Sequence, residues 1–185
     1  IIRRQFAMKN TMGYGINSLL DFETPLEIAR HLMIGSEGTL GFVTSATFRT
    51  IPVAPHAASA LAIFPTLREA TAALPDLVAA GFAAVELMDA QSLRVAQTLP
   101  EATPEILELD VTGQAALLLE LQDATAEGVG GKIEAVAPLL ASLPLTSPTQ
   151  ATSHGPTRAR LWHIRKGLYT TVAGHRNPGA TALLE

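Results

Sequence analysis

The stretch 35–43 contains three glycines and a threonine and reads Gly-Ser-Glu-Gly-Thr-Leu-Gly-Phe-Val. Because glycine has no Cβ, it accepts a positive φ angle and lets another molecule approach the main chain closely. A strand entered through such a turn can offer backbone N–H groups to a flat or phosphorylated cofactor. The simpler alternative is a tight turn that needs glycine for its own geometry. The stretch is neither a phosphate-binding P-loop nor a Gly-x-Gly-x-x-Gly dinucleotide turn.

A second candidate for chemistry is an arginine on the apolar face of the segment 157–173. At about 100° per residue, one helical stripe contains Leu161, Trp162, Ile164, Leu168, Tyr169 and Val172. Arg165 falls near the centre of this stripe, and Arg158 lies on nearly the same bearing. A guanidinium directed into an apolar face is costly unless an anion meets it, and arginine can hold a carboxylate through two parallel hydrogen bonds. The alternatives are an ion pair within the fold or a side chain that extends to solvent.

Other catalytic chemistries have little support in the sequence. The five histidines show no metal-binding spacing, so no metal site is expected. His31, beside the glycine stretch, is expected to have a surface or capping role. Glu86 and Asp89 resemble paired carboxylates, but Asp89 is more simply a helix cap. Ser36 lacks the motif of a hydrolase nucleophile, and no catalytic residue is assigned within the chain.

Composition narrows the class of protein further. The chain has 185 residues, 48% of them apolar, and no cysteine, which excludes disulfides and iron–sulfur ligation within it. No apolar run approaches the roughly 18 to 20 residues that span a bilayer and no signal peptide is present, so we expect a cytoplasmic protein without a membrane span. Residues 51–150 hold twelve acidic and three basic side chains, which argues against nucleic-acid binding. The first residue is Ile1 and the last lies in an apolar run, so we expect a piece of a longer protein.

The elements that position the glycine stretch are a helix before it and a strand after it. Thr24 is expected to cap the helix, with Pro25 at its first position and Glu27 completing a capping box. Gly35 ends this helix, and a strand over 41–49 follows. Two prolines in the segment 52–56 mark a boundary between two domains, which we place at 1–53 and 57–185.

The second domain alternates between strand and helix patterns. Four segments have the length and apolar content of buried strands: 58–64, 83–88, 115–121 and 145–151. The expected helices are a helix over 67–81 that Pro75 kinks or splits, a helix capped by Asp89, and a helix over 132–143. This order predicts an α+β fold, with a ferredoxin-like antiparallel sheet and helices on one face.

Several of these segments resemble the FAD-linked oxidases of the vanillyl-alcohol oxidase type. The match is closest to the bacterial D-2-hydroxyacid dehydrogenases that act on D-lactate or D-2-hydroxyglutarate. Its most specific part combines the glycine stretch with the segments 9–14, 25–28 and 44–48. A weaker likeness covers 85–89 and 161–165. The resemblance implies that residues 1–53 are the last helix and strand elements of an FAD-binding domain and that residues 57–185 belong to the cap domain.

The resemblance also implies roles for particular residues. Main-chain contacts with FAD fall on Glu37, Gly38, Thr39, Leu40, Gly41, Phe42 and Val43, and Lys9 and Asn10 line the flavin site. The arginine that contacts the substrate carboxylate in these dehydrogenases falls on Arg165, in the motif Trp-x-x-Arg. A threonine one turn later falls on Tyr169, so the chain departs from the family there. Arg158 and Arg176 are weaker candidates for a second carboxylate.

The resemblance implies a parent enzyme that oxidises a D-2-hydroxy acid to its 2-oxo acid by hydride transfer to FAD. The proton-abstracting residue of the family and any iron–sulfur segment would lie outside this chain, so we expect the isolated chain to be inactive and to bind FAD weakly. The expected partners are the small-molecule substrate and an unidentified electron acceptor, and a homodimer is left open. The alternative is a non-catalytic α+β module for ligand binding or oligomerisation.

Overall fold

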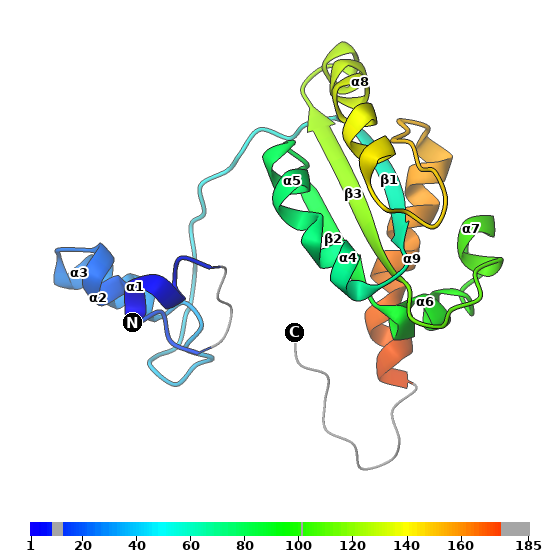
Figure 1. The fold of residues 1–185 in the computed structure, drawn as a ribbon. Coiled ribbons are helices and arrows are strands. Elements are labelled where there is room, and N and C mark those ends of the chain that lie inside the picture. Colours follow the sequence, from blue (N-terminus) through cyan, green and yellow to red (C-terminus); the bar gives the residue numbers. More distant parts are fainter. Residues whose placement is uncertain (9–12, 101, 175–185) are drawn as a thin grey trace. The chain divides into compact units, whose positions relative to one another are not determined.

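The computed structural model describes residues 1–8, 13–100 and 102–174, apart from the side chains of Tyr169 and Val172. The chain divides into two compact units, residues 1–51 and 52–185 (Figure 1). No helix in the described part of the chain is long and apolar enough to cross a lipid bilayer.

The first unit contains three helices: α1 (Ile2–Gln5), α2 (Ser18–Asp21) and α3 (Pro25–Leu32). The predicted start of α3 is confirmed, because Thr24 Oγ1 accepts a hydrogen bond from the backbone N–H of Glu27 at 3.3 Å. The Thr24 hydroxyl in turn donates to the Glu27 carboxylate at 2.8 Å, where a full capping box would use the backbone N–H of Thr24.

The strand expected over residues 41–49 is not present in the structure. Residues 41–55 have no regular secondary structure, and the side chain of Phe42 is 90% exposed. A strand is stabilised by the backbone hydrogen bonds of a neighbouring strand, and the described residues of the first unit include no strand that could pair with this segment. Its β-forming residues are therefore not sufficient to make it a strand here.

The second unit is built on the three strands β1 (His56–Phe64), β2 (Ala84–Met88) and β3 (Ala115–Asp123). The sheet order is β1-β3-β2, and both pairs are antiparallel. Ser59 of β1 lies opposite Glu120 of β3, and Leu118 of β3 lies opposite Glu86 of β2. These strands confirm three of the four predicted strands and the α+β class.

The fourth predicted strand, 145–151, is irregular. Thr146 donates its backbone N–H to Ile63 at 2.8 Å, and a single antiparallel bridge joins Thr152 to Ser59. Six residue steps separate the two contacts on this segment but only four separate them on β1, so the two cannot stay in register. Pro148, which lacks a backbone N–H, lies between them. The segment still occupies the outer edge of β1, where the ferredoxin-like fold places its fourth strand.

Helices cover both faces of this sheet (Figure 1). The predicted layer consists of α4 (Leu67–Ala72), α5 (Leu74–Ala79) and α8 (Ala126–Ser142), which pack on the alternate apolar residues of β1 and β3. As predicted, the helix pattern over 67–81 is interrupted near Pro75. The opposite face carries α6 (Ala90–Ala96), α7 (Pro104–Leu107) and α9 (Gly155–Gly174). Because the central strand β3 is buried from both sides, its residues 115–119 are all inaccessible to solvent.

One ion pair at the end of β3 makes the stability of the chain dependent on pH. Lys132 lies 3.0 Å from the Asp123 carboxylate, and its hydrogen bond holds the pKa of Asp123 below the usual value, with help from the backbone N–H of Thr125. A lowered folded-state pKa stabilises the fold above the unfolded-state pKa of about 4, and this contribution is lost as the pH falls through the folded-state pKa.

We therefore expect Asp123→Asn to lower the free energy of unfolding at neutral pH and to have a smaller effect at pH values below about 3. Urea unfolding of both chains across this range measures the difference. An effect of Asp123→Asn that does not change with pH would contradict this assignment.

Candidate functional site

The glycine stretch forms a turn whose backbone favours glycine at two positions, Gly35 and Gly38. Ser36 and Thr39 close the turn through a backbone hydrogen bond of 2.9 Å. A Cβ on Gly35, which has a φ of 74°, would lie 2.7 Å from the carbonyl oxygen of Gly13. Gly38 also has a positive φ, of 79°, but a Cβ there would meet open space. The positive φ angles thus account for both glycines, and Gly38 also leaves its main chain open to another molecule.

A side-chain contact joins this turn to the preceding segment. The hydroxyls of Tyr14 and Thr39 are 2.7 Å apart, and the Thr39 hydroxyl donates to the backbone carbonyl of Ser36, so Tyr14 is the donor to Thr39. The structure therefore brings together two of the segments that carry the resemblance. Lys9 and Asn10 lie outside the described residues.

The residues expected to contact a flavin lie on the surface of the first unit. Gly41 is half-buried, and the other six members are exposed: Glu37, Gly38, Thr39, Leu40, Phe42 and Val43. Among the described residues, the backbone N–H groups of 40–43 have no hydrogen-bond partner. Exposed main chain beside exposed apolar side chains fits a flat cofactor that is bound through peptide groups.

A hollow of about 560 Å³ lies close to the turn, and Gly13 and Gly35 both contribute to its wall. The hydroxyl of Ser18 is buried in this wall and has no hydrogen-bond partner. An unpaired buried polar atom is costly to the fold. His31 stacks on Phe22 with the ring centroids 3.7 Å apart, and its Nδ1 lies 2.8 Å from the Glu27 carbonyl oxygen, which gives His31 a local structural role.

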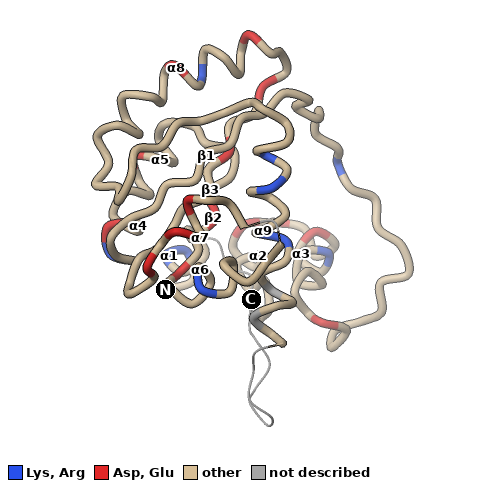
Figure 2. Tube along the Cα trace, turned by 90° about the vertical axis from the view of Figure 1, so that its right-hand side faces the viewer, with Lys and Arg blue, Asp and Glu red and all other residues tan. Residues whose placement is uncertain are grey.

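In the second unit, three side chains of α9 contact polar groups on the sheet. The Arg158 guanidinium donates to Glu120 at 3.1 Å, the Trp162 indole N–H to Ser59 at 3.1 Å, and Arg165 Nε to Glu86 at 2.9 Å. The donors recur at helical spacing, which places them on one face of α9 as the sequence predicts. Figure 2 shows the acidic and basic positions along the chain.

The two arginines lie in different environments. Arg158 belongs to a buried network in which Glu120, only 7% exposed, also accepts hydrogen bonds from Ser59 and Gln122. Arg158 Nε is itself buried and unpaired. These contacts correspond to the ion-pair alternative of the sequence analysis, and they use Arg158 to hold α9 on the sheet.

Arg165 is more open than Arg158. Its side chain is 40% exposed and that of Glu86 is 35% exposed. The described hydrogen bond uses only Nε, so the two terminal nitrogens, Nη1 and Nη2, have no described partner within the chain. Arg165 is therefore ion-paired, as the structural alternative requires, but its terminal nitrogens can still donate two parallel hydrogen bonds to a carboxylate.

The acidic partners of these arginines were not predicted from the sequence. Glu120 interrupts the buried apolar run of β3, and Glu86 shares the sheet face of Met88, so strand alternation was the signal that could have revealed both. Asp89 is confirmed as a helix cap, because its carboxylate accepts from the backbone N–H of Ser92 at 2.7 Å.

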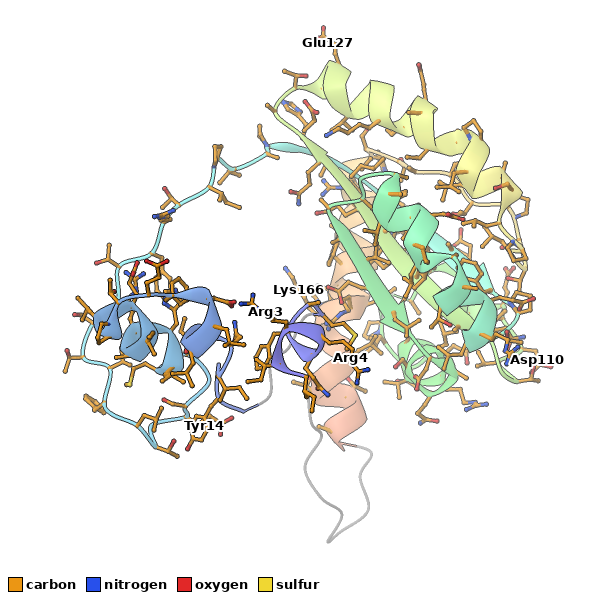
Figure 3. All side chains as sticks on the ribbon, turned by 60° about the vertical axis from the view of Figure 1, so that its left-hand side comes forward. Arg3, Arg4, Tyr14, Asp110, Glu127 and Lys166 are labelled. Carbon is orange, nitrogen blue, oxygen red and sulfur yellow. The ribbon has the colours of Figure 1, made fainter. Side chains whose placement is uncertain are left out.

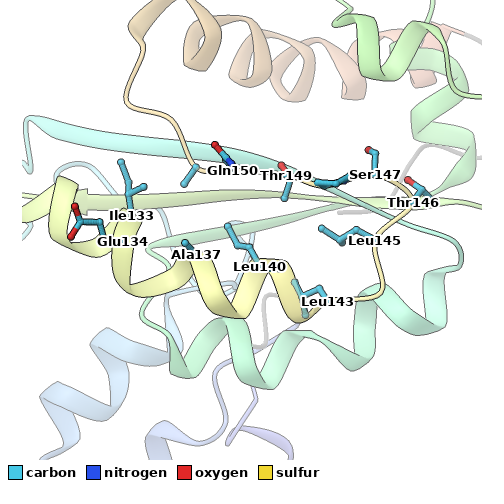
Figure 4. Close-up of a pocket in the computed structure, with 13 residues that line it drawn as sticks. Ile133, Glu134, Ala137, Leu140, Leu143, Leu145, Thr146, Ser147, Thr149 and Gln150 are labelled. Carbon is cyan, nitrogen blue, oxygen red and sulfur yellow. The ribbon is translucent and has the colours of Figure 1, made fainter.

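The remaining site predictions and one further hollow are described next. The side chain of Tyr169, together with all of Arg176, lies outside the described residues. The described part of the chain contains no cluster of acidic, histidine or cysteine side chains that could hold a metal ion. A larger hollow of about 700 Å³ between α8 and the segment 143–151 is lined mainly by aliphatic side chains and lacks a convergent set of charged groups (Figure 4).

Comparison with known families assigns this architecture. Residues 53–185 match the family described as FAD linked oxidases, C-terminal domain. This match covers most of the chain, and the chain therefore belongs to the FAD-linked oxidase family.

Individual relatives agree with the family match. The chain is 32% identical over 143 residues to the glycolate oxidase subunit GlcD of Escherichia coli strain K12, which covers 76% of the chain and 27% of that protein. It is also 32% identical over 117 residues to an uncharacterized FAD-linked oxidoreductase of Mycobacterium tuberculosis, over 60% of the chain and 25% of that protein. The chain thus spans about a quarter of the length of these curated relatives.

Proposed function

We propose that this chain is part of an FAD-dependent dehydrogenase that oxidises a D-2-hydroxy acid to the corresponding 2-oxo acid. The observation that carries the proposal is Arg165, which lies on a helix packed firmly on the sheet and whose terminal nitrogens have no partner among the described residues. The family supports the oxidoreductase class and the flavin. A fixed guanidinium adds a binding group for the carboxylate that every 2-hydroxy acid carries.

In this proposal each of the two units has its own role, one in contacting the FAD and the other in binding the substrate. The exposed main chain of residues 37–43 would contact the FAD, and Gly38 would permit a close approach. Bound flavin supplies the acceptor for the hydride that leaves the hydroxyl-bearing carbon. Arg165 would hold the substrate carboxylate and thereby fix the orientation of that carbon, which is a contribution from positioning.

Two arguments support a 2-hydroxy acid as the substrate: Arg165 can bind its carboxylate, and a relative of the chain is named for such an acid. GlcD is a subunit of a glycolate oxidase by name, and glycolate is a 2-hydroxy acid. Together with D-lactate and D-2-hydroxyglutarate, it forms a short panel that varies only the group distal to the carboxylate. A cytoplasmic location and an iron–sulfur segment outside this chain stay predictions.

The complete protein that carries this chain should be mixed anaerobically with each acid while the visible absorbance of its flavin is recorded. We expect reduction of the flavin by glycolate, which is achiral, or by at least one of the two D-acids, and none by the L-enantiomers of lactate and 2-hydroxyglutarate. A flavin that all acids leave oxidised would contradict the proposal.

A non-catalytic binding or oligomerisation module is the second candidate. The observation that favours it is that Arg158 and Arg165 both have acidic partners within the fold. This candidate predicts that the complete protein is colourless when purified and binds no added FAD.

A further inference from the structure

Glu86 is a carboxylate held on a rigid element beside Arg165. It lies in the middle of β2, an edge strand of the sheet, where its backbone pairs with Leu118 of β3. Its carboxylate accepts the hydrogen bond from Arg165 Nε at 2.9 Å, within the range of a strong charge-assisted bond.

The helix that carries Arg165 is equally fixed. Leu161, Ile164 and Leu168 of α9 are buried against the same sheet face that presents Glu86. Because these side chains are close-packed in the core, α9 has little freedom to slide or rotate. Both partners of the ion pair are thus placed by the core and not by a loop.

The hydrogen bond to Glu86 leaves the terminal nitrogens of Arg165 able to bind a ligand. A guanidinium has one Nε–H and two terminal nitrogens, and among the described residues only Nε has a hydrogen-bond partner. Without Glu86 the side chain would be free to rotate about several bonds, and a ligand would have to immobilise it at an entropic cost. With Glu86 bound at Nε, the terminal nitrogens point in a defined direction before any ligand arrives.

Stability alone does not account for the pair. Partly exposed ion pairs contribute about 0–1 kcal/mol to folding. The negative charge of Glu86 also opposes an incoming anion, so a site that required only a positive charge would do better without it. Orientation of the guanidinium is the effect that compensates for this repulsion.

We propose that Glu86 is a positioning residue that directs the terminal nitrogens of Arg165 toward a substrate carboxylate. This inference rests on the proposed function. Glu86 makes no contact with the substrate in this account and acts only through Arg165.

Two substitutions separate orientation from charge. Glu86→Gln keeps a carbonyl oxygen that accepts the Nε hydrogen bond, whereas Glu86→Ala removes it. In the complete protein, with the 2-hydroxy acid that reduces its flavin, we expect Glu86→Ala to raise KM about tenfold and Glu86→Gln to raise it by less than about threefold. Glu134→Ala on the far-side helix α8 removes the same charge from an exposed position and should leave KM unchanged.

The Nε–H signal of Arg165 in a nitrogen-15 spectrum of the complete protein reports the contact without any substrate. It should exchange slowly with water in the unsubstituted protein and in Glu86→Gln, and rapidly in Glu86→Ala. A KM that Glu86→Ala leaves within about twofold overturns the inference, as does an Nε–H signal that this substitution does not change. A lower KM in both Glu86 variants also overturns it, because Glu86 would then only compete with the substrate.

Arg165→Met distinguishes the failure of this inference from the failure of the proposed function. If Arg165→Met raises KM strongly but Glu86→Ala does not, the inference alone is wrong. If Arg165→Met also leaves KM unchanged, while the Nε–H signal of the unsubstituted protein shows an intact ion pair, the proposed role of Arg165 is wrong, and the inference is overturned with it.

Discussion

Replacing Arg165 by methionine in the complete protein is expected to lower kcat/KM for its 2-hydroxy acid by about 100- to 10,000-fold. A hydrogen bond to a charged group contributes about 1.5–3 kcal/mol, and the bidentate contact we propose contains two. The same substitution should change the free energy of unfolding by less than about 1 kcal/mol, because it breaks only the partly exposed pair with Glu86. Steady-state kinetics and urea unfolding measure the two effects.

Lys166→Met is the matched control, because Lys166 is the next residue of α9 and is exposed (Figure 3). It removes the same charge and should leave kcat/KM within about threefold of the unsubstituted protein, since it removes no contact with the substrate carboxylate. Equal losses in Arg165→Met and Lys166→Met would show that a general positive field, and not a specific contact, attracts the substrate.

Replacing Glu120 by alanine is expected to lower the free energy of unfolding by about 3–5 kcal/mol, more than any other substitution considered for this chain. The substitution leaves Arg158 in a largely buried position without its partner, and it also removes the acceptor used by Ser59 and Gln122. Urea unfolding can be followed by the fluorescence of Trp162, the single tryptophan, whose indole donates to Ser59 within the same network.

Glu86→Ala provides the comparison for Glu120→Ala, since both substitutions remove a glutamate that pairs with an arginine of α9. The two differ in the burial of the pair, and we expect Glu86→Ala to cost less than about 1 kcal/mol. Similar losses in the two variants would contradict the distinction between a structural Arg158 and an open Arg165.

The parts of the fold that the sequence predicted correctly depend on local patterns. The cap at Thr24, the cap at Asp89 and the interruption near Pro75 each involve residues within about one helical turn. The strands β1, β2 and β3 are apolar segments of the right length, and such segments are buried wherever the sheet places them.

The parts that the sequence did not predict depend on partners distant in the chain. The segment 41–49 has β-forming residues but no strand to pair with among the described residues of its own unit, and the segment 145–151 cannot match the register of β1. Helix α9 completes a second helical layer because its apolar stripe meets a sheet face, which its own sequence does not identify.

In the candidate site, too, the sequence did not predict contacts between residues that are distant in the chain. Helical spacing placed Arg158 and Arg165 on one face, but their partners are 38 and 79 residues away in the chain. Which arginine is buried depends on where Glu120 and Glu86 lie across the sheet, and this is set by the register of β2 on β3. The tertiary structure is therefore needed to separate the structural arginine from the open one.

The most direct test of this account is a crystal structure of the complete protein with FAD and the 2-oxo acid product of its reaction. We expect the product carboxylate to lie about 3 Å from both terminal nitrogens of Arg165 and the flavin to contact the main chain of residues 37–43. A product bound away from Arg165, or a flavin bound away from these residues, would contradict it.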